Sequence, residues 1–583
     1  MYIFLLVVST IITYTLLYTF NLKKLCKESN KLNLLIISFI TTTLLNNIII
    51  YVMIGNINLT DQYFCVTPIF IIKYIIMTII VSIVILFGYI QYLKNIKINK
   101  YGKKVKTRYS NIFTIIIIFL IVTLYMLTKD YPNITIEQLV FHLDNPLTNA
   151  AYDVILSFLK TPIIITLLIF TFLYYQQKLL NENKIQITYK DYHILPYKYY
   201  KKKNKIILFI VLIVMIIFTL NKYKIKDFIY SQILESNFID ENYINPDNVK
   251  IDFPEKKRNL IYIYVESMEK TFADYTPNLN KFFEQNTSFS SSDNYELGFK
   301  QLEGISWTMS SMVAQTAGLP LKFTSNNAYY NSKEENFLNK ATTLGEILAS
   351  NGYKNYLYLG SDSNFASKKN YFEQNGNYEI FDYNSAIEKK YIDKDYKEWW
   401  GFEDKKLFKY SKQKLLSISK NNEPFNFTIL TADTHPSDGY LEEDCEIKYE
   451  EQLANVLECT DSMIGEFVKW LEKQEFYNNT TIIIVGDHNY MEANPLIDKV
   501  KERNIYDVIL NSFQEENLNI RKFSAFDMFP TTLATLGVKI EGERLGLGTN
   551  LYSSEQTIIE KYNKKYVEKE LKKKSKLYNE ISK

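Results

Sequence analysis

Acidic and imidazole side chains follow two apolar, strand-like segments, at the point where each segment ends. Glu266 comes directly after the run LIYIYV, and Asp487 and His488 come directly after TIIIVG. Because the carboxyl ends of parallel strands meet at one edge of a sheet, we expect these side chains to gather there. Together they form a mixed oxygen and nitrogen ligand set for Mn²⁺, Mg²⁺ or Zn²⁺, and the oxygens favour the first two. For an acid after a strand, helix capping is the alternative interpretation.

Thr308 is the candidate nucleophile. It lies in the stretch QLEGISWTMSSMVAQTAGLPL, where Gly304 to Trp307 extend a helix poorly and Thr308 to Ala317 favour one. A helix that begins there presents free backbone N–H groups and a positive dipole end, which suit a phosphate. A hydroxyl that also coordinates a cation loses its proton more easily, so a neutral threonine can become a nucleophile. Plain N-capping is the alternative for a single threonine.

Histidine is scarce in this sequence. Of its four histidines, only His435 and His488 lie in the C-terminal part, and each follows a strand-like run. We therefore expect His435, in TILTADTHPSDG, at the same edge of the sheet, where it would contact a substrate headgroup or act as a general acid for the leaving group. A structural loop histidine is the alternative.

The chain resembles the sulfatase-fold phosphoglycerol transferases, a family that includes lipoteichoic acid synthases and the enzymes that decorate osmoregulated periplasmic glucans. The resemblance covers nearly all of residues 258–553 and rests on a set of motifs. These are IYIYVES, QLEGISWTMSSMVAQTAGLPL, GSDSNFASKKNYF, EWWGFED, LTADTHPSDG, GDHNYMEAN and FDMFPTTLATLG with RLGLGTNLYS.

The resemblance implies a reaction and assigns roles to residues. Thr308 would attack the phosphorus of phosphatidylglycerol, release diacylglycerol and carry a glycerophosphoryl group until an acceptor hydroxyl resolves it. The acceptor would be a cell-envelope glycan or a polyglycerolphosphate chain. Glu266, Thr308, Asp487 and His488 would hold the metal, which is commonly manganese in this family, with Mg²⁺ or Zn²⁺ as alternatives. His435 matches a histidine that contacts the substrate.

Lys368 marks a departure from the family pattern. It falls where the lipoteichoic acid synthases carry an arginine against the phosphate or glycerol, and Phe365-Ala366 stands where a tryptophan would precede it. A lysine contacts phosphate as a point charge instead of a bidentate fork, so a different glycerophosphate pose is expected. A phosphoethanolamine transferase is the competing interpretation, but those enzymes generally favour zinc and several disulfides, and this chain has four cysteines.

The first ~220 residues differ in composition from the rest. A chain of 583 residues is long enough to form several domains. Ile, Leu, Phe, Val and Tyr dominate this first part, in six apolar runs at about 2–20, 33–54, 68–93, 112–128, 160–179 and 206–220. Runs of this length suit membrane-spanning helices. The prediction is an α-helical polytopic membrane domain over residues 1–220.

The basic residues predict how this membrane domain is oriented. Lysines and one arginine cluster at Lys23 to Lys31, Lys94 to Arg108 and Lys184 to Lys205, which are the loops after the first, third and fifth runs. The positive-inside rule then places everything after the sixth run outside the cytoplasm. We expect a multi-pass protein of the bacterial inner membrane whose catalytic domain faces the periplasmic side. The net charge of +3 is not arranged as a nucleic-acid-binding stripe.

The remaining chain is expected to form a juxtamembrane helix and linker over 221–257, a sulfatase-like catalytic domain over 258–553 and a basic tail over 554–583. Strand-like and helix-like segments alternate in the catalytic domain, which predicts an α/β fold with a central, mainly parallel sheet. Strands are expected at 260–265, 354–359, 425–430, 480–485 and near Val508. Helices are expected at 278–285, 405–418, about 449–473 and from Thr531 through Leu536.

Two features of this region have open alternatives. If the domain lies outside the cytoplasm, Cys445 and Cys459 can form a disulfide that closes a short loop, and two free thiols are the alternative. The basic tail KYNKKYVEKELKKKSKLYNEISK is expected to be a solvated charged helix, with attraction to anionic lipid as the alternative.

Overall fold

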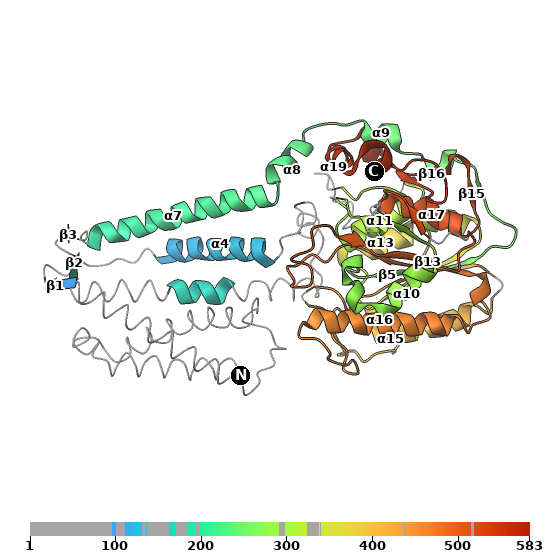
Figure 1. Cartoon of the computed structure of the whole chain (residues 1–583), viewed down its shortest axis with the longest axis horizontal. Helices are drawn as coiled ribbons and strands as arrows, with labels where there is room; N and C mark the ends of the chain where they lie inside the picture. The colour runs from blue at the N-terminus through green and yellow to red at the C-terminus, as the bar shows by residue number, and fades with distance from the viewer. Residues whose placement is uncertain are drawn as a thin grey trace. The chain divides into compact units, whose positions relative to one another are not determined.

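The computed structural model describes residues 197–582 apart from 291–297, 303, 323–336, 339, 422, 437 and 515–517. It also describes the shorter segments 96–100, 111–130, 136, 162–170, 185–189 and 192–193. The chain divides into two compact units, one formed by 1–128 and 154–219 and the other by 129–153 and 220–583 (Figure 1). The apolar runs predicted at 2–20, 33–54 and 68–93 lie outside the described residues.

The first unit contains helices over the other predicted apolar runs. Helix α4 spans Asn111–Asp130, residues 162–170 are helical, and α7 spans Tyr197–Lys222. Strands β1 (Ile96–Lys100), β2 (Ile185–Tyr189) and β3 (Tyr192–His193) form a small antiparallel sheet. Within the described residues, no single helix meets the combined length and hydropathy expected of a membrane span. The pair Ile206–Lys222 and Ile225–Ser231, bent by 54°, meets them jointly.

A six-stranded sheet organises the second unit, in the order β13-β11-β5-β10-β8-β9. Every neighbouring pair is parallel except β13, which runs antiparallel to β11. The strands are β5 (Asn259–Val265), β8 (Lys354–Leu359), β9 (Glu379–Phe381), β10 (Phe425–Leu430), β11 (Thr480–Gly486) and β13 (Asp507–Leu510). The predicted mainly parallel sheet is confirmed.

Both faces of this sheet are buried, and β5 shows why its sequence is apolar throughout. Leu260, Tyr262 and Tyr264 join one core cluster, whereas the alternate residues Ile261 and Ile263 join another. A strand covered on both sides must be apolar at every position, because successive side chains point to opposite faces. Helices α11 (Thr308–Ala317) and α17 (Met528–Thr535) pack on the first face, and α10 (Pro277–Gln285), α15 (Asp404–Ile418) and α16 (Gln452–Leu471) pack on the second (Figure 1).

The predicted helices are found, with two shifted ends. Helix α16 is shorter than the predicted 449–473, because Oδ1 of Asn455 accepts hydrogen bonds from the backbone N–H groups of Lys448 and Tyr449 and holds them in a loop. Helix α17 begins at Met528, earlier than predicted. Pro530 is its third residue, and proline is tolerated in the first turn, where its missing N–H has no partner to lose.

Shorter elements complete the second unit. The helices are α8 (Ile225–Ser231), α9 (Phe238–Asn242), α12 (Leu344–Ser350), α13 (Lys368–Gln374), α14 (Tyr383–Glu388), α18 (Ile558–Tyr562), α19 (Lys564–Leu571) and α20 (Lys576–Ile581). Two-stranded ladders pair β4 (Ile251–Asp252) with β15 (Lys539–Ile540), β6 (Ser288–Ser290) with β14 (Leu518–Ile520), β7 (Phe299–Lys300) with β12 (Asn504–Ile505), and β16 (Arg544–Leu545) with β17 (Gly548–Thr549).

The C-terminal residues pack onto the same core. Four apolar residues of this segment are buried in the core cluster on the first face of the sheet: Ile558, Val567, Leu571 and Tyr578. The backbone N–H of Lys574 donates to the carbonyl of Leu234, so this segment is also hydrogen-bonded to the chain that leads from α8 to α9. Residues 558–581 are therefore an integral part of the folded domain, with their lysines on its outside.

Candidate active site

Thr308 is the first residue of α11, as the sequence predicts, and its side chain is half-buried. Its Oγ1 donates a hydrogen bond of 3.3 Å to Oε2 of Glu266 and lies 3.5 Å from Nε2 of His488. The hydroxyl at the N-terminus of this helix therefore faces both an acid at the end of β5 and an imidazole beyond the end of β11.

Glu266, Asp487 and His488 form a buried cluster whose side chains are close enough together to hold a metal ion. One potential ligand atom from each residue lies within 4.8 Å of the other two. Nε2 of His488 is 3.4 Å from Oε1 of Glu266 and 3.4 Å from Oδ2 of Asp487. That Oδ2 atom of Asp487 is buried and has no hydrogen-bond partner among the described residues, which is costly unless a cation satisfies it. The donor set fits a divalent cation.

The protonation of the cluster also fits a cation. Nδ1 of His488 lies 2.9 Å from the carbonyl oxygen of Asn489, so Nδ1 carries one proton, and the proton that the imidazolium gains is on Nε2, which faces the acids. Burial, and then the charge of Glu266, raise the pKa of Asp487 to about 7. Burial lowers the pKa of His488, but the charges of Asp487 and Glu266 outweigh the effect of burial and raise this pKa to about 9. A divalent cation would stabilise the ionised acids and take the place of the proton on Nε2 of His488.

The ends of β5 and β11 fix these ligands. The two strands are parallel neighbours with Val265 opposite Gly486. A Cβ on Gly486 would lie 1.9 Å from the carbonyl oxygen of Met268, so only glycine lets the turn after β5 cross the end of β11. In that turn Ser267 adopts a φ of +53°, a strained conformation for serine, and its hydroxyl donates to Oε1 of Glu266 at 2.8 Å.

His435 lies in the loop after β10, close to Glu266. The hydroxyl of the adjacent Thr434 donates to the backbone carbonyl of Glu266. Nδ1 of His435 lies 2.6 Å from the carbonyl oxygen of Pro436, which leaves Nε2 as an acceptor, and its ring lies 4.5 Å from the ring of Trp400. Burial lowers the pKa of His435, and the charge of Glu266 opposes this shift.

Lys368 is the first residue of α13 and is buried. Burial lowers the pKa of its ammonium to about 8, while Glu266, Asp362 and Asp487 act in the opposite direction. Its Nζ donates to the carbonyl of Phe365 at 2.9 Å, and the ring of Phe365 lies 5.6 Å from that of Trp400. Phe365 therefore links Lys368 to Trp400, whose ring also contacts His435.

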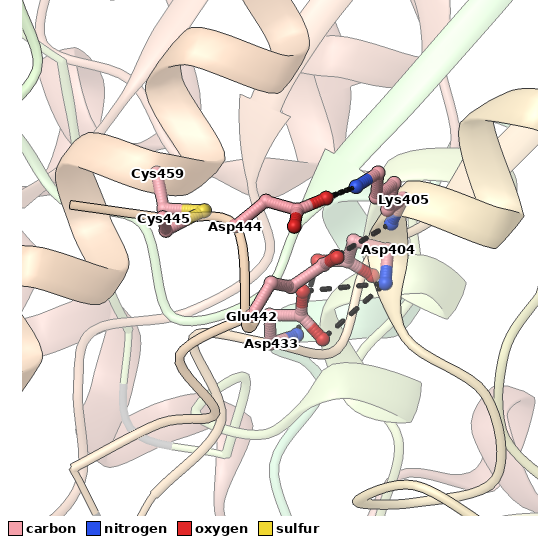
Figure 2. The surroundings of a disulfide bond; sticks show 7 residues. All are labelled: Asp404, Lys405, Asp433, Glu442, Asp444, Cys445 and Cys459. Atoms are coloured by element: carbon pink, nitrogen blue, oxygen red, sulfur yellow. Dashed lines mark hydrogen bonds and ion pairs between the residues drawn. A yellow bond between two sulfur atoms is a disulfide. The ribbon is translucent and has the colours of Figure 1, made fainter.

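Two buried aspartates hold the His435 loop against the start of α15, and the sequence analysis did not identify them. The carboxylate of Asp404 accepts the backbone N–H groups of Ala432 at 2.8 Å and Asp433 at 3.0 Å. The carboxylate of Asp433 accepts the N–H of Asp404 in return, at 3.2 Å (Figure 2). Burial raises the pKa of Asp404 to about 7. The signal was present in the motifs EWWGFED and LTADTH, each of which carries one of the two acids.

A disulfide supports the same loop from its far side. Cys445 and Cys459 are bonded, with their Cα atoms 5.8 Å apart, so the loop after His435 is tied to α16. Figure 2 shows Glu442 and Asp444, both in the loop between His435 and Cys445, close to the start of α15. Glu442 accepts the backbone N–H of Lys405 at 2.8 Å, and Asp444 forms an ion pair with the Lys405 side chain.

Comparisons with known proteins agree with this arrangement. The model of the sulfatase family matches residues 258–538. Phosphoglycerol transferase I of Escherichia coli (strain SMS-3-5 / SECEC) is 28% identical over 318 residues, which cover 52% of this chain and 40% of that protein. The enzyme of the same name from Citrobacter koseri is 28% identical over 319 residues, with the same coverage.

Solved structures are similar at a more distant level. A protein of the alkaline phosphatase superfamily from Vibrio parahaemolyticus has a TM-score of 0.40 and 20% identity, over 52% of this chain and 71% of that one. The lipoteichoic acid synthase LtaP from Listeria monocytogenes has a TM-score of 0.40 and 16% identity, over 55% of this chain and 81% of that one.

Residues 258–538, which match the sulfatase family model, carry the parallel sheet, the acids at the strand ends and the hydroxyl at the start of α11. The predicted resemblance to the phosphoglycerol transferases is confirmed. The chain spans about two-fifths of the length of the curated relatives it matches.

Proposed function

We propose that the chain is a membrane-bound transferase that moves glycerol phosphate from phosphatidylglycerol to a cell-envelope glycan or polyglycerolphosphate acceptor. The observation that carries the proposal is the position of Thr308. Thr308 is the first residue of a buried helix. Its hydroxyl donates a hydrogen bond of 3.3 Å to Glu266, beside the buried cluster of Asp487 and His488. The similarity to enzymes named phosphoglycerol transferase I supports glycerol phosphate as the transferred group.

The reaction is a double displacement on phosphorus. The Thr308 hydroxyl gives up its proton and forms a bond to phosphorus while the bond from phosphorus to the diacylglycerol oxygen breaks, and diacylglycerol leaves after taking up a proton. An acceptor hydroxyl then gives up its proton and attacks the same phosphorus, the bond from phosphorus to Thr308 breaks, and Thr308 takes up a proton. The backbone N–H groups in the first turn of α11 would stabilise the negative charge of the phosphate in both steps.

The metal and the remaining side chains have separate tasks. A divalent cation held by Glu266, Thr308, Asp487 and His488 would lower the pKa of the hydroxyl and offset phosphate charge, and Mn²⁺, Mg²⁺ and Zn²⁺ all suit this donor set. Lys368 would contact the glycerophosphate as a point charge. His435 would contact the headgroup through Nε2, which is free of the bond to Pro436, or Nε2 would take up a proton and pass it to the leaving diacylglycerol.

The location follows from the donor. Phosphatidylglycerol is a membrane lipid, so a domain tethered at the outer surface of the bacterial inner membrane meets it in two dimensions. The disulfide between Cys445 and Cys459 supports an oxidising, extracytoplasmic setting.

The test offers two donors to the full-length protein in detergent with Mn²⁺. Diacylglycerol release from phosphatidylglycerol, at a rate at least about tenfold above that from phosphatidylethanolamine, is the expected result. Preferential release from phosphatidylethanolamine would replace the proposal with a phosphoethanolamine transferase. No release from either lipid by folded, metal-loaded protein would reject both.

A further inference from the structure

A groove of about 790 Å³ lies on the domain beside the segments that hold His435. It is partly open to solvent, and the half-buried residues Tyr396 and Tyr440 line it. Carboxylates outnumber lysines by six to four among the lining residues, and Lys405 and Lys406 are already paired with Asp444 and Glu403. The groove is thus aromatic and mildly acidic.

A strained turn connects this groove to the candidate active site. Glu398 and Gly401 exchange both backbone hydrogen bonds at 2.9 Å, so Trp399 and Trp400 alone form the turn between them. Trp399 has a φ of +54°, a conformation that glycine or asparagine normally occupies in such turns. This strained backbone conformation directs the two indole rings to different partners. Trp400 contacts His435, with ring centroids 4.5 Å apart, and Trp399 stacks on Tyr440, with centroids 6.3 Å apart and an interplanar angle of 26°.

Tyr440 is anchored to the His435 loop itself. Its backbone N–H donates to the carbonyl of Asp433 at 2.7 Å, and its hydroxyl donates to Oε2 of Glu398 at 3.2 Å. The indole N–H of Trp399 donates to the carbonyl of Ala432 at 3.0 Å. One rigid unit therefore carries both the ring of Tyr440 in the groove and the imidazole of His435 near Glu266.

We propose that this groove binds the sugar rings of a neutral glycan, with Tyr440 as the stacking residue, and so selects a glycan as the acceptor. The C–H groups of a sugar face are attracted to the negative face of an aromatic ring, and carboxylates accept hydrogen bonds from sugar hydroxyls. A polyglycerolphosphate chain is polyanionic, and a groove with a carboxylate excess and paired lysines repels it. The role of this glycan as acceptor rests on the proposed function, whereas the binding of the glycan to the groove does not.

The test measures sugar binding directly. Isothermal calorimetry on the full-length protein in detergent would use maltohexaose and laminarihexaose as neutral probes and poly(glycerol phosphate) as the polyanionic probe. We expect saturable binding of at least one sugar and none of the polyanion. Tyr440→Ala should weaken sugar binding at least about tenfold, and Tyr440→Phe by less than about threefold, because it keeps the ring.

Controls separate the groove from the fold and from the donor reaction. Tyr566→Ala removes another tyrosine ring, 45% exposed, and should leave sugar binding unchanged. Tyr396→Ala removes the second ring of the groove and should weaken binding even if Tyr440→Ala does not fold. Diacylglycerol release from phosphatidylglycerol in the absence of sugar should be equal in wild type and Tyr566→Ala.

The outcomes are distinguishable. Absence of sugar binding, equal binding by Tyr440→Ala and wild type, or binding of the polyanion that depends on Tyr440 would overturn the glycan groove. Failure of the wild type to release diacylglycerol would overturn the proposed function instead, and calorimetry would still decide whether the groove binds sugar.

Discussion

The backbone N–H of Ser267 donates a 2.7 Å hydrogen bond to Oδ1 of Asp487, across the ends of the neighbouring strands β5 and β11. The N–H of His488 donates to the same oxygen at 2.8 Å. With Oδ1 occupied twice, the buried Oδ2 is directed toward His488, 3.4 Å away, and within the described part of the chain it has no hydrogen-bond partner. Two backbone donors thus orient one carboxylate for a cation.

Asp487→Asn tests this orientation. An amide has the same shape but no charge and is a poor ligand, so Mn²⁺ affinity should fall by at least about 100-fold. Calorimetric titration of the full-length protein with Mn²⁺ measures it. The matched control is Asp507→Asn, another fully buried aspartate, which should change the affinity less than about threefold. Equal affinities of Asp487→Asn and wild type would remove Asp487 from the metal site.

Asp404→Asn tests the support of the His435 loop. An amide has one oxygen where the carboxylate has two, so it cannot accept both backbone N–H groups, of Ala432 and Asp433, in the same way. We expect kcat for diacylglycerol release to fall roughly tenfold, with KM for phosphatidylglycerol and Mn²⁺ affinity nearly unchanged. If Asp404 only positions the loop, kcat should fall without a change in KM or Mn²⁺ affinity at temperatures well below the melting temperature of the variant. A parallel loss of Mn²⁺ affinity would indicate general unfolding instead.

Several elements follow directly from the sequence. The strand β5 was predictable because every residue of LIYIYV is buried on one face or the other, and the parallel sheet followed from the alternation of strands and helices. The convergence of Glu266 and Asp487 followed from the rule for strand ends. Thr308 was placed at a helix start because the residues before it do not favour a helix.

Other features depend on tertiary contacts that a single sequence does not reveal. Asp404 and Asp433 meet through backbone N–H groups of segments 29 residues apart. In the C-terminal segment the many lysines obscured Val567 and Leu571, which lie at helical spacing and are buried. The turn of Trp399 and Trp400 departs from ordinary turn composition, so no local rule predicts it.

Buried acids give the domain a specific pH dependence, and Asp507 shows the sign. Burial raises its pKa from 3.8 to about 8, with Lys270 opposing, so folding takes up a proton between these values. The contribution of Asp507 to stability is therefore most favourable below pH 4 and is lost as pH rises toward 8. Asp507→Asn removes this term and should stabilise the protein at pH 8, on the order of a few kcal/mol, with little effect near pH 4. Thermal melts of both proteins across this range measure it, and parallel pH profiles would contradict the assignment.

The disulfide is expected to stabilise the loop after His435. Cys445 and Cys459 are separated by 14 positions, and closing a loop of this length is worth about 3 kcal/mol in the chain-entropy model. Reduction, or the double variant Cys445→Ser with Cys459→Ser, should lower the melting temperature, and hydrogen exchange should rise first in residues 438–450. Reduction that changes neither measurement would show that Glu442 and Asp444 hold the loop without the bond.

The central claim is that Thr308 is the covalent nucleophile, and mass spectrometry of the full-length protein tests it most directly. Wild type and Thr308→Ala would be incubated with Mn²⁺ and phosphatidylglycerol without acceptor, digested, and searched for modified peptides. The account predicts a glycerophosphate adduct on Thr308 of the wild type, accompanied by diacylglycerol, with neither product from Thr308→Ala. A folded, metal-loaded wild type that forms no adduct, or a Thr308→Ala variant that still releases diacylglycerol, would contradict it.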